Sequence, residues 1–339
     1  MDDSELHGLL SDLPGSPTAK QYRNLARALL PYIQAHVPPM GEGRSLARLQ
    51  FLIEVARRDL GLARILEGHL DATQILHEAE RTAEPGALYG VWASGGPDDT
   101  THFMQSEAIG ARDALSGSKP FCSGSDIVDR ALVYVYPNEQ LVDVDMQAAS
   151  AEHRLRFERG QWKAQAFSET HTWTVTFDQL PIGPEQKVGE QKWYFERPGF
   201  CLGTLAPAAC WAGGASGLVD HVRQRTLKGG HAKAHLGAIV AASQSNVAML
   251  EWGATRIDTD PANEQGHMFA TALLVRHLIE RNCTEVLDRF GRALGPRPFA
   301  FDEVNARRTT ELQLYIRQCH AESDLEELGT HLAAHPNFP

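Results

Sequence analysis

The spacing of apolar residues changes twice along this chain of 339 residues, and that change constrains the fold more than any single motif. In residues 22–77 apolar side chains recur at steps of three and four, as on a helix with one buried face. Between about 87 and 199, short runs of β-branched and aromatic residues alternate with Gly- and Pro-containing turns, which is typical of strands. Helical spacing returns from 205 to 328. This order predicts an α+β chain with separate helical and sheet parts.

The pattern also predicts individual elements. We expect helices over 22–37 and, starting at the N-cap candidate Ser45, without interruption to His77. Later helices are expected over 205–224, 232–255, 264–291 and 301–328, with Gly329 as a C-cap candidate. Strands are expected over 88–92, 131–136, 141–146 and 171–177, forming a small antiparallel barrel or sandwich. The predicted domains are an N-terminal helical domain (1–86), a central β domain (87–199) and a C-terminal four-helix bundle (200–339).

Charge and composition narrow the class of protein. A formal net charge of -11 argues against a general nucleic-acid binder. The apolar run 202–218 is too short and too rich in Ala and Gly to span a bilayer comfortably, and is expected to be core. The five cysteines are scattered and show no CxxC spacing, and the acidic N-terminus lacks the features of a secretory signal. We therefore expect a soluble cytoplasmic protein with no nucleic-acid and no membrane partner.

One segment carries the clearest chemical signal, Leu115-Ser-Gly-Ser-Lys-Pro-Phe-Cys-Ser-Gly124. It predicts a short strand whose end offers an aromatic ring at Phe121, a hydroxyl at Ser123 and backbone donors. A flat cofactor needs such groups. The alternative is that Trp92 and Phe121 are ordinary core aromatics of a β domain and that Ser123 is a turn residue.

Several segments resemble acyl-CoA dehydrogenases in the order in which that family has them. Residues 47–66 resemble its long N-domain helix, and 90–97 occupy the place of its flavin-contacting Thr-Glu-Pro strand. Residues 115–124 resemble its second flavin strand, 173–183 the strand that leads into its Val-Pro turn, and 198–200 the start of its C-terminal bundle. The resemblance implies an acyl-CoA dehydrogenase-like fold and a homodimer that binds FAD.

The resemblance also implies site residues and a substrate. It predicts that groups at Trp92, Ala93, Ser94, Cys122 and Ser123 hydrogen-bond the polar edge of the flavin and that Phe121 packs against its ring. The substrate would be a small acyl thioester, CoA-linked or related, that loses two hydrogens from its α and β carbons.

The chain departs from the family at several points. Thr226-Leu-Lys-Gly-Gly230 stands where the family has an Arg that reaches the FAD pyrophosphate, and Gly291-Arg-Ala-Leu-Gly295 replaces its Gly-Gly element. The position of the usual catalytic Glu falls on Arg317 or Gln318. Neither side chain can accept a proton, so the usual dehydrogenase mechanism lacks its base there.

His320 and Glu322 are the catalytic candidates that remain near this position. On a continuous helix Arg317, His320 and Asp324 share one face, and an imidazole is a suitable base near neutral pH. The alternative is a solvated network of charged side chains. Some flavin monooxygenases of this fold use a late-bundle His where the dehydrogenases use Glu.

No metal site is expected. His231 and His235 have the spacing of two metal ligands on a helix, but no acidic third ligand lies nearby in the sequence, so a surface or structural pair is favoured. Cys122 has only Lys119 nearby to lower its pKa, which favours a buried small residue.

The leading prediction is an FAD-dependent oxidoreductase acting on an acyl thioester or related substrate. Three alternatives remain open: a flavin-dependent monooxygenase of the same fold, a cofactor-free binding or scaffold paralogue, and a non-flavin enzyme that reuses the cleft.

Overall fold

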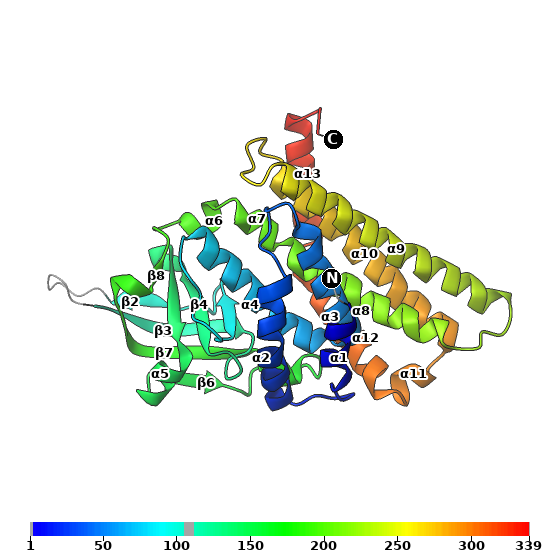
Figure 1. Cartoon of the computed structure of the whole chain (residues 1–339), viewed down its shortest axis with the longest axis horizontal. Coiled ribbons are helices and arrows are strands. Elements are labelled where there is room, and N and C mark those ends of the chain that lie inside the picture. Colours follow the sequence, from blue (N-terminus) through cyan, green and yellow to red (C-terminus); the bar gives the residue numbers. More distant parts are fainter. Residues whose placement is uncertain (1–2, 105–111, 339) are drawn as a thin grey trace. The chain divides into compact units, whose positions relative to one another are not determined.

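A computed structural model describes residues 3–104 and 112–338, which fall into two compact units (Figure 1). The helical unit contains residues 1–16, 32–64 and 201–339, and the sheet unit contains 17–31 and 65–200. Helices α2 (Ala19–His36) and α4 (Leu60–Glu78) each contribute residues to both units. The α+β prediction is confirmed, whereas the predicted domain boundaries at 86/87 and 199/200 stay a prediction.

The helical unit is built on long helices that match the predicted order. α8, α9 and α10 pack against one another, and α3 packs on α8 and α9. The short helix α7 (Gly199–Gly203) precedes α8. The other helices of this unit are α1 (Asp3–Ser11), α3 (Ser45–Arg58), α8 (Leu205–Arg223), α9 (Gly230–Thr259), α10 (Met268–Leu294), α11 (Arg297–Ala300), α12 (Glu303–Tyr315), the 3-10 turn η4 (Ile316–Gln318) and α13 (Glu322–Ala334).

Helix α8 owes its close approach to α3 to its small residues. A Cβ on Gly213 would lie 2.3 Å from the carbonyl oxygen of Ile53, so no larger residue fits without displacing α3. Most of α8 is buried. The run rich in Ala and Gly is therefore core, as expected.

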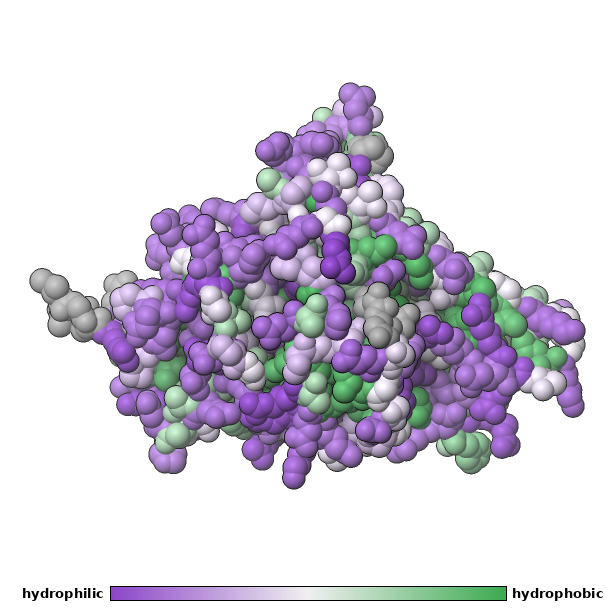
Figure 2. Space-filling view, in the orientation of Figure 1, coloured by the Kyte–Doolittle hydropathy of each residue, from purple (hydrophilic) through white to green (hydrophobic). Residues whose placement is uncertain are grey.

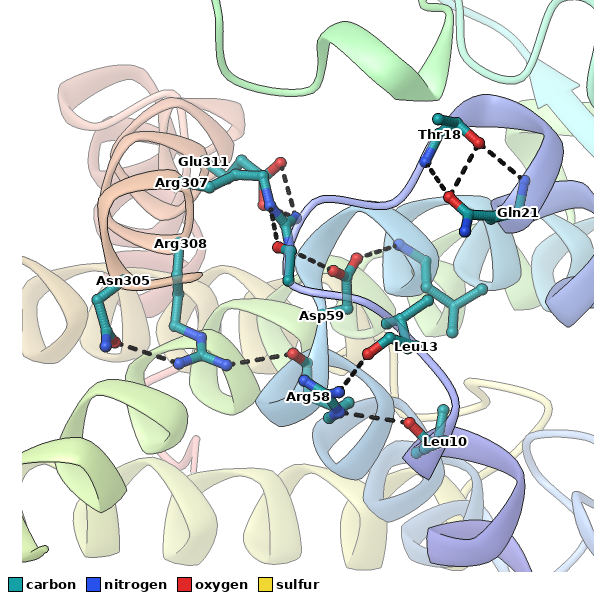
Figure 3. A network of polar contacts seen from close by, with 12 residues as sticks. Leu10, Leu13, Thr18, Gln21, Arg58, Asp59, Asn305, Arg307, Arg308 and Glu311 are labelled. Atoms are coloured by element: carbon teal, nitrogen blue, oxygen red, sulfur yellow. Dashed lines mark hydrogen bonds and ion pairs between the residues drawn. The ribbon is translucent and has the colours of Figure 1, made fainter. Parts of the chain in front are cut away.

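The helix predicted to run without interruption from Ser45 to His77 is broken at Asp59, so that prediction is wrong. Asp59 is extended (φ -158°, ψ 122°), and its carboxylate accepts the backbone N–H of Leu62 at 2.8 Å in the first turn of α4. The same carboxylate pairs with Arg307 of α12 at 2.6 Å, and Arg308 donates to the carbonyl of Arg58 at 3.1 Å (Figure 3). The break depends on partners about 250 residues away, which apolar spacing cannot reveal.

Two predicted helix ends also differ. The N-cap of α3 is Arg44, and the hydroxyl of Ser45, the predicted cap, contacts the N–H of Gly41 (2.8 Å) and the carboxylate of Asp258 (2.5 Å). Gly329 is not a C-cap, because α13 continues through it to Ala334.

The described part of the sheet unit forms two four-stranded sheets, which agrees with the predicted barrel or sandwich. One parallel pair, β1 with β4, departs from the antiparallel expectation. The first sheet has the order β1 (Tyr89–Trp92), β4 (Arg130–Val135), β5 (Gln140–Asp145), β8 (Lys187–Val188), and the second β2 (His102–Met104), β3 (Asp113–Cys122), β7 (Trp173–Ile182), β6 (Leu155–Glu158). Short helical segments connect them: α5 (Met146–Ala151), α6 (Trp193–Glu196), η1 (Tyr136–Asn138), η2 (Ser168–Thr170) and η3 (Pro184–Gln186).

The core of the sheet unit lies between α4 and the first sheet. Ile75 and Leu76 of α4 are buried against Tyr89, Leu132 and Leu141, which come from β1, β4 and β5 in turn. Burying such aliphatic and aromatic side chains supplies the main free energy that holds the sheet in place. The packing fixes β1, and with it the segment that follows Trp92.

The face seen in Figure 2 is mostly hydrophilic, in keeping with the net charge of -11. Across the described residues, no helix combines the length and apolar character needed to cross a bilayer.

Candidate functional site

The end of β3 contains one of the two irregularities in its pairing with β7. The pairing of β3 with β7 shifts register between Lys119 and Cys122, which makes room for an extra residue. Phe121 adopts a left-handed backbone conformation (φ 57°), and its side chain is 58% exposed. A bulky residue at positive φ is uncommon, and an exposed phenylalanine at such a position is a candidate contact for a flat ligand.

Ser123 is held by a residue of β1 and by the residue that precedes β7. The indole N–H of Trp92 donates to the Ser123 carbonyl at 3.0 Å, and the Thr172 hydroxyl donates to the Ser123 hydroxyl at 3.1 Å. Its backbone N–H donates to the Phe121 carbonyl at 3.0 Å. Three of the predicted flavin-contacting residues therefore lie together, with Trp92 buried as a support and Phe121 exposed as a surface.

Cys122, which lies between Phe121 and Ser123 in the chain, is buried. Its thiol donates to the Lys119 carbonyl at 3.2 Å, and burial raises the pKa of the thiol well above its usual range. The side chain is a protonated core residue, as the sequence indicated, so that only backbone groups of Cys122 could face a cofactor.

Ala93 and Ser94 follow β1 in a loop of the same unit. The Ala93 carbonyl accepts a hydrogen bond from the Tyr136 hydroxyl at 2.9 Å, and Ala93 packs against the core beneath. Ser94 is half-buried beside it. This loop and the end of β3 offer an aromatic ring, hydroxyls and backbone groups from two neighbouring segments, which fits the face and polar edge of a flavin.

A histidine that the sequence did not suggest lies next to this site. His171 Nδ1 is 2.6 Å from a carboxylate oxygen of Asp126, and its ring stacks on Trp173 at 4.2 Å between centroids. The N–H of Ser125 donates to the His171 carbonyl at 3.1 Å. A carboxylate that holds one imidazole nitrogen orients the other for proton exchange. A His at the first position of the strand predicted over 171–177 was the available signal, but Asp126 lies 45 residues earlier.

His320 and Glu322 belong to the helical unit, and the continuous helix predicted around them is wrong. α12 ends at Tyr315, η4 follows, and Ala321 has a left-handed backbone (φ 51°) before α13 begins at Glu322. The His320 side chain is 75% exposed and lies 3.3 Å from the carboxylate of Asp324.

The residues at the family's base position have partners of their own. Arg317 pairs with Glu280 of α10 at 2.6 Å, and the Gln318 carbonyl accepts from Arg276 at 2.7 Å. The predicted shared face of Arg317, His320 and Asp324 is therefore not formed, because the helix ends before it.

The pair His231 and His235 lies near the start of α9, with His231 exposed and His235 3.3 Å from Arg289. In the described ranges, no group of three His, Cys, Asp or Glu side chains could hold a metal ion.

No protein-family model matches the chain, and no curated protein matches it in sequence. Solved structures do match over nearly its whole length. The chain has the acyl-CoA dehydrogenase fold.

Three of these structures illustrate the match. TdsC of Paenibacillus sp. A11-2, in complex with FMN and indole, has a TM-score of 0.77 and 16% identity over 95% of this chain and 92% of its own. Methanesulfinate monooxygenase MsuC of Pseudomonas fluorescens has a TM-score of 0.76 and 16% identity, over 100% of this chain and 98% of its own. KijD3, in complex with FMN and a dTDP-linked sugar, has a TM-score of 0.76 and 15% identity, over 98% of this chain and 91% of its own. At this identity the likeness establishes the fold, which confirms the predicted fold class.

Proposed function

We propose that this protein is a flavin-dependent monooxygenase that holds its cofactor at Phe121–Ser123 and oxidises a small organic substrate. The observation that carries the proposal is the exposed ring of Phe121, which stands in a left-handed backbone at the end of β3. Holding a non-glycine residue there costs of order 1 kcal/mol or more, and such strain gathers at ligand-binding sites.

The residues of the sheet unit divide the work of binding. Phe121 packs against the ring system, while Ser94 and Ser123 hydrogen-bond its polar edge. Trp92 is buried and supports Ser123 through its indole N–H. When bound and reduced, the flavin supplies electrons to dioxygen, so that the protein has to orient the ring, exclude water and move protons. His171, held by Asp126, is our preferred candidate for proton exchange, ahead of the earlier candidates His320 and Glu322 of the helical unit.

A monooxygenase fits the chain better than an acyl-CoA dehydrogenase. Dehydrogenation needs a carboxylate base beside the substrate α-carbon, and the corresponding position holds Arg317, engaged with Glu280. Oxygenation by a reduced flavin needs no such base. The structural neighbours TdsC and MsuC are named as monooxygenases, which supports the same reading.

FMN is the preferred cofactor of this proposal, although the resemblance alone suggested FAD. The family's Arg contact to the FAD pyrophosphate is replaced by Thr226–Gly230, which removes a reason to bind the larger cofactor. The TdsC and KijD3 complexes contain FMN. We expect FMN to bind more tightly than FAD.

Titration of the purified protein with FMN and with FAD, followed by flavin fluorescence and the visible spectrum, tests the proposal. Phe121→Ala should weaken FMN binding at least tenfold, because the ring loses its stacking surface. Phe301→Ala is the matched control, since Phe301 is 81% exposed in the helical unit and should leave affinity unchanged. A wild type that binds neither flavin would refute the proposal and favour the cofactor-free alternative.

A second measurement separates the reaction classes. With FMN, NADH and a flavin reductase, we expect substrate-dependent oxygen uptake and an oxygenated product. Anaerobic bleaching of the bound flavin by an acyl-CoA would instead favour the dehydrogenase. Light scattering of the same sample tests whether the protein forms the homodimer that the family resemblance implies.

A further inference from the structure

The loop after β1, residues 93–101, carries Ala93 and Ser94 and lies against β3. Thr100 N–H donates to the Ser118 carbonyl at 2.9 Å, and Ser118 N–H donates to the Thr100 hydroxyl at 2.9 Å. Gly117 has φ 101°, and a Cβ there would lie 2.1 Å from the Thr100 carbonyl oxygen. The strand therefore admits the loop only because it has no side chain at this point.

A buried ion pair lies at the same junction. The Lys119 ammonium is 2.6 Å from the Asp99 carboxylate, with side-chain exposures of 0% and 2%. Lys119 also donates to the Tyr134 carbonyl at 2.7 Å. The other carboxylate oxygen of Asp99 accepts from the backbone N–H and hydroxyl of Thr101 at 3.1 and 2.6 Å. Each charge thus has hydrogen-bond partners inside the protein: two acceptors for the ammonium, and the ammonium and Thr101 for the carboxylate.

The opposite end of the loop is tied to the same lysine through an aromatic ring. The Tyr136 hydroxyl donates to the Ala93 carbonyl at 2.9 Å, and the Lys119 ammonium lies 4.8 Å from the centre of the Tyr136 ring. A Cβ on Gly95 would lie 2.6 Å from the Tyr136 ring, so the loop is packed directly on it. Lys119 contacts one end of the loop directly and the other through Tyr136.

The stability of the fold does not by itself account for this buried pair. Taking both charges out of water costs about as much as their attraction returns, so that an apolar pair of similar size stabilises a fold equally well. Burial lowers the pKa of Lys119 although Asp99 beside it raises it, which shows the cost of desolvation. The pair instead favours a single arrangement of loop and strand, because each charge finds its buried hydrogen-bond partners only in that arrangement.

We propose that Lys119 and Asp99 form a loop clamp that positions residues 93–101 against β3 for flavin binding. Lys119 is two residues from Phe121 along the same strand, and Asp99 fixes the loop that brings Ala93 and Ser94 to the polar edge of the ring. Lys119 is thus a positioning residue, and its role rests on the proposed function. Loss of the clamp leaves a folded protein in which the two halves of the flavin site no longer keep their spacing.

The test removes both charges together, so that neither is left unpaired. The double variant Lys119→Met with Asp99→Leu should remain soluble, with a melting temperature similar to that of the wild type. FMN affinity should fall at least tenfold, and the visible circular dichroism of bound FMN should weaken. The matched control is Lys187→Met with Asp113→Leu, which removes a Lys–Asp pair of 2.8 Å from the same unit away from the loop. It should leave both flavin signals unchanged.

Tyr136→Phe gives a second route that buries no charge. It removes only the hydrogen bond to Ala93, and it should lower FMN affinity in the same direction by a smaller factor. Hydrogen exchange of amides 93–101 should become faster in both variants. Faster exchange with unchanged flavin affinity and dichroism would overturn the clamp's functional role while leaving the proposed function intact. A wild type that binds neither FMN nor FAD would refute both.

Discussion

The strand end 119–124 in the sheet unit and the helix junction 316–321 in the helical unit both carry predicted site residues, and both contain a non-glycine residue at positive φ. Their surroundings differ. At the strand end, Ser123 takes hydrogen bonds from β1 and from the residue before β7, and Lys119 is fully buried. At the junction, the His320 side chain is 75% exposed, and both its ring and its backbone N–H contact the carboxylate of Asp324.

We interpret the strand end as a prepared site, in which several elements hold each residue in place, and the junction as a surface turn. Backbone strain is kept where several neighbouring elements determine it, as they do at Phe121. An exposed imidazole paired with a single carboxylate gains little free energy from that pair and moves readily. We therefore expect substitutions at the strand end to have larger effects on binding and stability than substitutions at the junction.

The largest effect is expected from breaking one side of the buried pair. Lys119→Met alone leaves Asp99 buried without its cation, which should lower the free energy of unfolding by about 3–5 kcal/mol. Arg317→Met removes a pair whose arginine is 57% exposed, and the Glu280 side chain, which is only 12% exposed, keeps the Thr284 hydroxyl as a donor, so the variant should cost about 1 kcal/mol. Urea denaturation of both variants measures the difference. Equal costs would mean that the strand end is no better determined than the junction.

The histidines give the next largest contrast, and the test concerns rate. His171→Gln should lower the oxygenation rate about a hundredfold, because general acid–base groups contribute on that order. His320→Ala and Glu322→Gln should leave the oxygenation rate within about twofold of the wild-type value, as expected for exposed groups outside a prepared site. Steady-state oxygen uptake coupled to product formation, on a substrate that the wild type turns over, is the measurement. The reverse result would make His320 or Glu322 the proton-transfer group.

The sequence predicts the parts of this comparison that depend on local pattern. The change in apolar spacing indicated the α+β order, and the motif 115–124 indicated a strand that ends in Phe121 and Ser123. It could not indicate the end of α12 at Tyr315 or the break at Asp59, because distant partners such as Arg307 help to determine such ends. The pairing of His171 with Asp126 is hidden for the same reason.

A smaller effect isolates one hydrogen bond of the strand end. Trp92→Phe removes the indole N–H that donates to Ser123, and the lost bond should cost about 1 kcal/mol in addition to the smaller ring. Trp211→Phe is the matched control, because Trp211 is also buried and its indole N–H has no hydrogen-bond partner among the described residues. The difference in unfolding free energy between the two variants, measured with urea, gives the value of the bond. No difference would mean that Trp92 does not support Ser123.

The smallest expected effect is pH-dependent and concerns His221 in the last turn of α8, which contacts Asn305 of α12 at 2.8 Å and is more enclosed than His320. Burial lowers the pKa of His221, the charge of Arg225 lowers it further, and Asp302 opposes them. The unfolded chain therefore binds this proton more readily than the folded one, so stability present above the ordinary pKa of about 6.5 is lost as pH falls through the folded value. The melting temperature should drop between pH 7 and pH 5 more in the wild type than in His221→Gln. An equal drop would place the acid sensitivity elsewhere. The matched control is His320→Gln, at a side chain that is 75% exposed, and its melting temperature should follow that of the wild type.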